Sequence, residues 1–307
     1  MRPIILILGP TAGGKTSLAI ALANALEGSG ECICADSMQI YKHMDIGTAK
    51  PTANECESAV HHLVDIVEPR EDGFTVETWL KRAEKTIEEI RGRGKWPIVV
   101  GGTNLYVQSL LFGMFDGPEC DQEKRDILKS LPNTQLQERL RRLDPEAAER
   151  IHINDTRRLV RALEVCEATG HPLSSLQSQW GKPMPREDAL MIGLQWPVKT
   201  INRRINSRVR TMFDDGFLEE VTALKGKLGT QASEALGYKQ LLAHLRGECT
   251  LDEAKERIKI LTRRYAKQQR TWLRKFEVLP TAHFIAMDNK GTQHAVAEAL
   301  TYISGQK

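Results

Sequence analysis

Residues 4–16 read Ile4-Ile5-Leu6-Ile7-Leu8-Gly9-Pro10-Thr11-Ala12-Gly13-Gly14-Lys15-Thr16. An apolar run, a G-x-x-x-x-G-K-T loop and a helical pattern reaching Leu26 follow one another, which predicts a strand, a phosphate-binding loop and a helix. In such a loop the backbone N–H groups surround an anion, the helix N-terminus adds a positive dipole, and Lys15 reaches the outer phosphate. The Thr16 hydroxyl is a predicted Mg²⁺ ligand. Gly9 to Thr16 therefore form a predicted phosphate or diphosphate site, and the motif leaves open whether the diphosphate belongs to a nucleotide.

The composition is that of a globular protein. Of 307 residues, 27% are charged and 41% are apolar, which is ordinary for a soluble chain. The longest apolar run is Ile4 to Leu8, too short to cross a membrane, and a strand so near Met1 leaves no room for a targeting peptide. We expect a cytoplasmic protein. The cysteines show neither C-x-x-C pairs nor zinc spacing, so we expect reduced thiols at Cys32, Cys34, Cys56, Cys120, Cys166 and Cys249.

Positive charge is concentrated in two segments, although the net charge is only +3. Residues 255–275 hold nine Lys or Arg and one acid, Glu256, and residues 199–210 hold five basic residues and no acid. A solvated helix face normally mixes both signs, so these segments favour a polyanionic partner. Within the first, we expect one helix face to be lined by Ile258, Leu261, Tyr265 and Trp272. Within the second, Ile201, Ile205, Val209 and Met212 are predicted to face the core, which leaves an arginine free to close over a diphosphate.

Two further strands are predicted to end near the phosphate loop. Residues 31–35 precede Asp36, and residues 97–100 precede Gly101-Gly102-Thr103. Because ligands gather beyond the carboxyl ends of parallel strands, we expect Asp36 to face the loop and Thr103 to lie beside it. Judged alone, Asp36 is better explained by a turn or helix cap, and the G-G-T segment by a tight turn, than by a ligand contact. His61-His62 is read as structural.

Residues 116–185 differ in character from the rest. No strand is predicted there, whereas Leu136, Leu140 and Leu143 make one helical stripe and Leu159, Leu163 and Cys166 another. Strand patterns resume at residues 189–194 and 283–287. The predicted fold class is therefore α/β: a P-loop parallel sheet flanked by helices, formed by residues 1–115 and 186–307, with an inserted all-helical domain at 116–185.

Six separated blocks in the same order resemble the tRNA dimethylallyltransferases. The blocks are Gly9-Pro10-Thr11-Ala12-Gly13-Gly14-Lys15-Thr16, Asp36-Ser37-Met38-Gln39-Ile40-Tyr41, Gly47-Thr48-Ala49-Lys50-Pro51, Gly101-Gly102-Thr103-Asn104-Leu105-Tyr106, residues 154–165 and residues 264–274. The resemblance spans nearly the whole chain. One departure is Gly13, where the family usually has Ser, and from it we expect a looser loop with retained activity.

The resemblance implies transfer of a dimethylallyl group from dimethylallyl diphosphate to N6 of adenine 37, just 3′ of the anticodon, in tRNA. It implies Asp36 as general base, with Lys15, Thr16, Thr103, Arg208 and a Mg²⁺ ion completing the catalytic site. It places tRNA contacts on Asp36, Ser37, Met38, Gln39, Thr103, Arg125, Arg157, Arg158, Leu159, Val160 and Arg161. The expected partners are the tRNA anticodon stem-loop and dimethylallyl diphosphate, with no membrane, and we expect a monomer.

Three alternatives remain. A P-loop kinase of a small metabolite would use Lys15 and Thr16 for ATP·Mg²⁺ and Asp36 to activate a hydroxyl, but has no need of a long basic helix. An adenylate dimethylallyltransferase, acting on free adenine nucleotides, would need no tRNA surface. A non-enzymatic RNA-binding module would leave Lys15 and Asp36 without a role.

Overall fold

The computed structural model describes residues 1–114, 117–118, 121–176, 185–287 and 291–306. Contacts divide the chain into two compact units, Met1–Leu111 with Arg186–Lys307, and Phe112–Pro185. The insertion thus begins at Phe112, before the expected residue 116, and it returns at the expected place. The predicted boundary residues 115 and 116 and the expected thiol at Cys120 lie outside the described residues.

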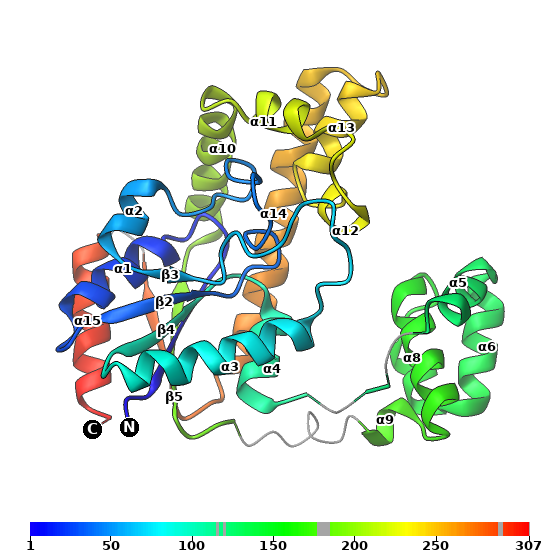
Figure 1. Ribbon diagram of the computed structural model, residues 1–307, viewed down its shortest axis with the longest axis horizontal. Coiled ribbons are helices and arrows are strands. Elements are labelled where there is room, and N and C mark those ends of the chain that lie inside the picture. The colour runs from blue at the N-terminus through cyan, green and yellow to red at the C-terminus, as the bar shows by residue number, and fades with distance from the viewer. Residues whose placement is uncertain (115–116, 119–120, 177–184, 288–290, 307) are drawn as a thin grey trace. The chain divides into compact units, whose positions relative to one another are not determined.

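The first unit contains a six-stranded, entirely parallel sheet (Figure 1). Its strand order is β3-β2-β4-β1-β5-β6, with β1 in the interior. Parallel strands covered on both faces read as continuous apolar runs, and every residue of β1 and β4 is buried. The strands are β1 Ile4–Leu8, β2 Gly30–Cys34, β3 His61–His62, β4 Trp96–Val100, β5 Ala189–Gln195 and β6 Ala282–Ala286.

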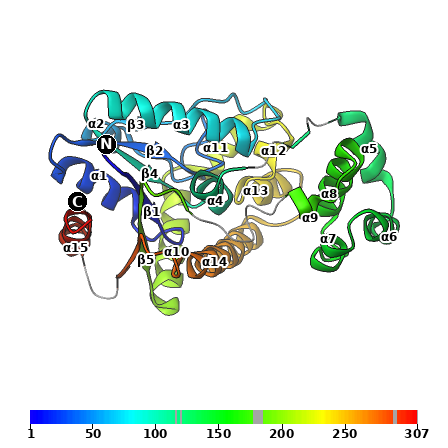
Figure 2. The same ribbon diagram turned by 90° about the horizontal axis from the view of Figure 1, so that it is seen from below.

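Helices cover both faces of this sheet (Figure 2). On one face, buried residues of α1 and α15 join side chains of β1, β4 and β5 in one apolar cluster. On the other, α3 packs against β2 and β4, and its N-cap is Thr75, whose hydroxyl accepts from the Thr78 amide. The helices of this unit are α1 Lys15–Ala25, α2 Ala53–Ser58, α3 Val76–Gly92, α4 Asn104–Phe112, α10 Val198–Asp214, α11 Phe217–Leu224, α12 Thr230–Ser233, α13 Tyr238–Leu245, α14 Leu251–Phe276 and α15 Thr292–Ser304.

A second apolar cluster joins residues 40–67 to helices α10, α11, α13 and α14. The predicted core face of α10 is confirmed, because Ile201, Ile205, Val209 and Met212 are buried. The prediction for α14 was partly wrong. Its buried stripe contains Ile258 but otherwise lies beside the expected one, so Leu261, Tyr265 and Trp272 are only half-buried. The stripe comprises Ala254, Ile258, Thr262, Ala266, Gln269, Leu273 and Phe276.

The second unit is helical, and its described residues contain no strand. Helix α8 is N-capped by Asp155, whose carboxylate accepts from the Arg158 amide, and C-capped by Gly170 in the left-handed conformation. Leu143, expected in the first stripe, is 41% exposed. The helices are α5 Gln122–Ser130, α6 Asn133–Leu143, α7 Pro145–Arg150, α8 Thr156–Thr169 and α9 Leu173–Leu176.

Throughout the part of the chain that the structure describes, every helix is too short or too polar to cross a membrane. The expected thiols in that part, at Cys32, Cys34, Cys56, Cys166 and Cys249, are all free. His62 is structural as expected, because its Nε2 lies 2.7 Å from Glu31 Oε2 at the start of β2.

Candidate active site

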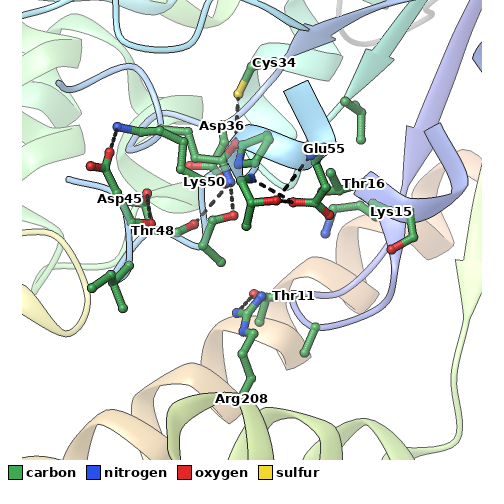
Figure 3. Close-up of a pocket in the computed structure, with 18 of the residues that line it drawn as sticks. Thr11, Lys15, Thr16, Cys34, Asp36, Asp45, Thr48, Lys50, Glu55 and Arg208 are labelled. Carbon is green, nitrogen blue, oxygen red and sulfur yellow. Dashed lines mark hydrogen bonds and ion pairs between the residues drawn. The ribbon is translucent and has the colours of Figure 1, made fainter. Parts of the chain in front are cut away.

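Loops after four strands meet at the carboxyl edge of the sheet. The phosphate loop follows β1, Asp36 follows β2, Gly101 follows β4, and Trp196 follows β5. A cavity of about 1000 Å³ opens there, lined by Thr11 to Ser17, Asp36, residues 45–56 and the α10 side chains Arg204 and Arg208. In Figure 3, Arg208 points from α10 toward Thr11, while Lys15, Thr16 and Asp36 lie across the cavity from it. The predicted approach of Asp36 to the phosphate loop is confirmed.

The phosphate loop is shaped by its backbone. Gly14 has φ 84° and caps the N-terminus of α1, and Ala12 also has a positive φ, 60°. A non-glycine residue in this region is strained, which is common where a loop is built around a ligand. The Gly13 amide donates to the Pro10 carbonyl at 3.0 Å. Of the predicted loop residues, Gly9 and Pro10 are buried beneath the cavity and do not line it.

Two side chains donate hydrogen bonds to backbone carbonyls of this loop. Trp196 Nε1 donates to the Gly13 carbonyl at 3.0 Å, and Arg204 Nε donates to the Ala12 carbonyl at 2.8 Å. The Arg204 guanidinium also lies over the Trp196 ring, 4.6 Å from its centroid. A Cβ added at Gly13 would come within 2.7 Å of the Pro10 carbonyl oxygen. In this structure Gly13 lies in a tight turn whose carbonyls are held by two donors, and the expectation that it is looser than the family's serine loop stays a prediction.

Two cations face the loop from opposite sides. Lys15 Nζ donates to the Pro10 carbonyl at 3.1 Å, and Arg208 Nη2 donates to the Thr11 hydroxyl. Burial, and secondarily the charge of Arg208, lower the pKa of Lys15 to about 8, which Asp36 partly opposes. Burial lowers the pKa of Arg208 to about 10. Among the described residues, the buried Arg208 Nε has no hydrogen-bond partner. A buried cation with an unpartnered donor, facing the same cavity as Lys15, is suited to an anionic ligand.

Asp36 is held by a local turn, in which its Oδ1 accepts from the Met38 amide at 2.9 Å. Asp36 therefore forms a turn and also lines the cavity, while its role as general base stays a prediction. Gln39 also lines the cavity, but its side-chain amide donates to the Thr48 and Ala49 carbonyls at 3.1 and 3.0 Å. Met38 is partly buried against the second apolar cluster. Met38 and Gln39, which are predicted tRNA contacts, therefore hold the segment after β2 against residues 48–49 and the second apolar cluster.

The G-G-T segment is more than a tight turn. A Cβ at Gly101 would come within 2.2 Å of the Ala35 carbonyl oxygen, so β2 and β4 can meet there only at a glycine. Thr103 Oγ1 accepts from the Ser37 amide at 2.9 Å, next to Asp36. Thr103 and Ser37 border the cavity residues without lining the cavity themselves. Thr103 is thus coupled to the Asp36 turn rather than to the phosphate loop directly.

The predicted tRNA contacts in the second unit fall into two kinds. The side chains of Leu159 and Val160 are buried in the core of that unit, at 0% and 3% exposure, so their assignment to tRNA contact is corrected to packing. Arg125 forms two hydrogen bonds to the Glu164 carboxylate, and Arg161 Nη1 lies 3.5 Å from the same group. Arg157 and Arg158 are exposed on α8. The arginines therefore remain the candidates for a nucleic acid contact.

Three residues that build the site were not singled out from the sequence. Glu220 of α11 accepts from the amides of residues 45–47, and the buried Lys50 side chain ties the same loop to Asp45 and Asp65. Gln269 of α14 contacts the phosphate loop directly. The one signal for Lys50 and for Gln269 was that each lies within a block that resembles the family. For Glu220 the sequence offers no signal.

The Thr16 hydroxyl is the candidate protein ligand for a Mg²⁺ ion, which prefers oxygen donors. The described residues contain no group of three or more His, Cys, Asp or Glu side chains placed to hold a metal. However, Mg²⁺ commonly takes only one or two protein ligands and completes its shell with phosphate oxygens and water. The Thr16 hydroxyl lines the cavity at the start of α1, where such an ion would meet a bound diphosphate.

The parallel sheet and the Gly14-Lys15-Thr16 junction define a P-loop α/β protein, and the cavity lined by Lys15 and Arg208 is its candidate site. A family model described as IPP transferase matches residues 39–276. The sequence is 44% identical to the tRNA dimethylallyltransferase of Thermoanaerobacter sp. (strain X514), covering 99% of this chain and 98% of that protein. The chain belongs to the tRNA dimethylallyltransferase family, a family of transferases.

Solved structures agree with this assignment. The crystal structure of a tRNA delta(2)-isopentenylpyrophosphate transferase from Staphylococcus epidermidis matches with a TM-score of 0.72 and 37% identity, covering 100% of both chains. A eukaryotic dimethylallyltransferase acting on tRNA matches with a TM-score of 0.84 and 29% identity, covering 100% of this chain and 81% of that chain.

Proposed function

We propose that the protein transfers the dimethylallyl group of dimethylallyl diphosphate to the N6 amine of the adenine just 3′ of the anticodon in tRNA. The observation that carries this proposal is the shared cavity of Lys15, Arg208 and Asp36, in which two cations and a carboxylate face one space. The relatives' names support a tRNA acceptor and a five-carbon donor. The atom N6 and the position in the loop are our inference.

The cations act on the leaving group. Breaking the allylic C–O bond places charge on the departing diphosphate, so the transition state gains most from donors aimed at that charge. The loop amides, Lys15 Nζ and the Arg208 guanidinium supply these donors. Lys15 is poised to change protonation because its pKa is about 8, and a bound polyanion favours its charged form.

Asp36 acts on the acceptor. The adenine amine is a poor nucleophile because its lone pair is delocalised into the ring, and it sheds a proton as the new C–N bond forms. The hydrogen bond from the Met38 amide orients the Asp36 carboxylate to accept that proton. A positioned base of this kind contributes on the order of 10²- to 10⁴-fold to the rate.

A Mg²⁺ ion, when bound at Thr16 with the donor diphosphate, supplies further positive charge to the leaving group. The Thr16 hydroxyl and the diphosphate oxygens are the ligands we propose, with water completing the shell.

For the acceptor side, we propose that the anticodon stem-loop docks on exposed arginines of the second unit and on the basic face of α14, with the protein acting as a monomer. The adenine must leave its stack to reach a cavity at the sheet edge. Candidates for backbone contact are Arg125, Arg157, Arg158, Arg161, Arg264 and Lys267.

A label-transfer assay tests the function. The purified protein is mixed with bulk tRNA or with AMP, and with either labelled dimethylallyl diphosphate or labelled ATP. We expect prenyl label in tRNA alone, and nucleoside digestion should place it on N6 of adenosine. Phosphate transfer to a small molecule would support the kinase alternative, and prenyl transfer to AMP would support the free-nucleotide alternative.

A further inference from the structure

Gln269 contacts two loops of the site, although it belongs to α14, which is distant from both in the sequence. Its side chain is 1% exposed. Its Oε1 accepts from the Thr11 amide of the phosphate loop at 2.7 Å, and its Nε2 donates to the Gly102 carbonyl at 3.0 Å. One amide group therefore satisfies a backbone donor after β1 and a backbone acceptor after β4, and its orientation is fixed by both.

The Gly102 carbonyl is also bound by a second residue of α14. The Tyr265 hydroxyl donates to it at 3.1 Å. Burial and the charge of Asp36 raise the pKa of Tyr265, so the hydroxyl stays a donor. A Cβ at Gly102 would come within 2.2 Å of Gln269 Nε2, so glycine is needed for this approach. The next residue, Thr103, accepts from the Ser37 amide beside Asp36.

These contacts form one continuous path between the two halves of the site. It runs from Thr11 in the phosphate loop, through the Gln269 amide, to Gly102 and Thr103, and then to the turn that carries Asp36. A backbone hydrogen bond from the Gly101 amide to the Ile7 carbonyl of β1 also links the two strand ends, but it is long at 3.5 Å. Without Gln269, the Thr11 amide and the Gly102 carbonyl would lose these partners in a buried environment.

We propose that Gln269 is a positioning residue that fixes the phosphate loop and the Asp36 turn relative to each other, so that the diphosphate and the acceptor base are held in line. Tyr265 supports only the second half of this bridge, because it contacts Gly102 and not Thr11. The proposal rests on the proposed function for its rate measurements, but its binding measurements do not depend on the reaction. Misplacement of reacting groups by about 1 Å is enough to cost on the order of 10²-fold in rate.

The test compares Gln269→Leu, Tyr265→Phe and the control Gln268→Leu, whose native side chain is the exposed neighbour on the same helix. Binding of inorganic pyrophosphate is measured by calorimetry, and prenyl transfer by single-turnover rates at saturating donor and tRNA. We expect Gln269→Leu to weaken pyrophosphate binding about tenfold and to lower the single-turnover rate at least about tenfold. Tyr265→Phe should lower the rate about three- to tenfold and leave pyrophosphate affinity within about twofold. Gln268→Leu should match the native protein in both.

Melting temperature and tRNA affinity are measured in parallel to detect a folding defect. If Gln269→Leu does not fold, the single-turnover rate of Tyr265→Phe tests the bridge instead, and a native rate in that variant would overturn the proposal. A loss of thermal stability with native pyrophosphate affinity and a native single-turnover rate would overturn the proposal, since it would make Gln269 merely structural. Equal losses of pyrophosphate affinity in Gln269→Leu and Tyr265→Phe would also overturn it, because only Gln269 contacts the phosphate loop.

Discussion

Trp196 Nε1 donates a hydrogen bond to the Gly13 carbonyl at 3.0 Å, which joins the end of β5 to the phosphate loop. The carbonyl oxygens of such a loop must point away from the bound anion, because its amides point toward it. Trp196 and Arg204 donate to the carbonyl oxygens of Gly13 and Ala12 and so give two of those oxygens partners. The clamp thus helps to set the direction of the amides before a ligand arrives.

The Trp196→Phe variant tests this clamp. It keeps an aromatic ring under Arg204 and removes only the N–H donor. We expect the KM for dimethylallyl diphosphate to rise about three- to tenfold, and the free energy of unfolding to fall by about 1 kcal/mol. Steady-state kinetics and urea unfolding measure the two effects, with Trp272→Phe on α14 as the matched control. A native donor KM would show that the loop does not need this donor.

Asp36→Asn separates the base role from the turn. The asparagine side-chain oxygen can still accept from the Met38 amide, so the turn should persist. Because an amide cannot take a proton from adenine, turnover should fall at least about 10²-fold, while tRNA and pyrophosphate affinities stay within a few-fold. Rapid-quench transfer assays and filter binding measure these quantities. Near-native turnover would remove Asp36 from the base role.

Much of this site can be predicted from the sequence because its residues directly follow buried strands. Lys15 and Asp36 each come directly after a buried strand, and parallel topology brings those ends together. The position of Gln269 is different, since its contact with Thr11 joins residues 258 positions apart and depends on the path of α14. No local pattern specifies such a contact.

Two differences from the sequence predictions concern burial. Leu159 belongs to an apolar helical stripe that packs into the core of the second unit, and a side chain in the core cannot contact tRNA. The buried stripe of α14 includes Thr262 and Gln269 in place of the apolar Leu261 and Trp272, because both polar side chains are hydrogen-bonded within the protein. The contact of Glu220 with residues 45–47 could not be predicted from the sequence, because a carboxylate that accepts backbone amides can lie anywhere in a chain.

Lys15 should make diphosphate binding depend on pH. Its pKa in the ligand-free protein is about 8, so the ammonium is charged below that pH and neutral above it. Pyrophosphate affinity should therefore fall as pH rises past about 8, by up to tenfold per pH unit, because binding must then take up a proton. Calorimetry from about pH 6.5 to about pH 9.5 measures this slope. Lys15→Arg is the control, because its side chain stays charged and its pH dependence reports only the titration of pyrophosphate itself. Equal slopes of affinity against pH in the two proteins would contradict the role of Lys15.

Glu31 should contribute stability that is lost in acid. It is 3% exposed and lies 2.7 Å from His62 Nε2, 2.6 Å from Arg93 Nη2 and 2.9 Å from Lys95 Nζ. Burial alone would raise its pKa, but hydrogen bonds from these partners outweigh burial and lower it from 4.5 to about 2. A depressed carboxyl pKa stabilises the fold above the unfolded value and loses that effect as pH falls toward the folded value.

We therefore expect Glu31→Gln to lower the free energy of unfolding by about 3 kcal/mol at neutral pH, with the difference shrinking between about pH 4.5 and about pH 2. Urea unfolding at several pH values measures it, and the exposed Glu57→Gln serves as control. A difference that stays constant with pH would mean that the charge of Glu31 is not what stabilises the strands.

The basic face of α14 should give tRNA binding a strong salt dependence. Arg264 and Lys267 are exposed on that helix, whose buried stripe carries Gln269. Each phosphate contact releases counterions from the RNA, so removing one contact lowers the slope of log affinity against log salt by about one. We expect Arg264→Ala and Lys267→Ala each to weaken tRNA binding and to reduce that slope, leaving pyrophosphate affinity unchanged. Lys227→Ala, an exposed lysine beyond the end of α11, should change neither. Fluorescence titrations over a range of salt concentrations measure the slopes, and a flat salt response in the native protein would place the RNA on another surface.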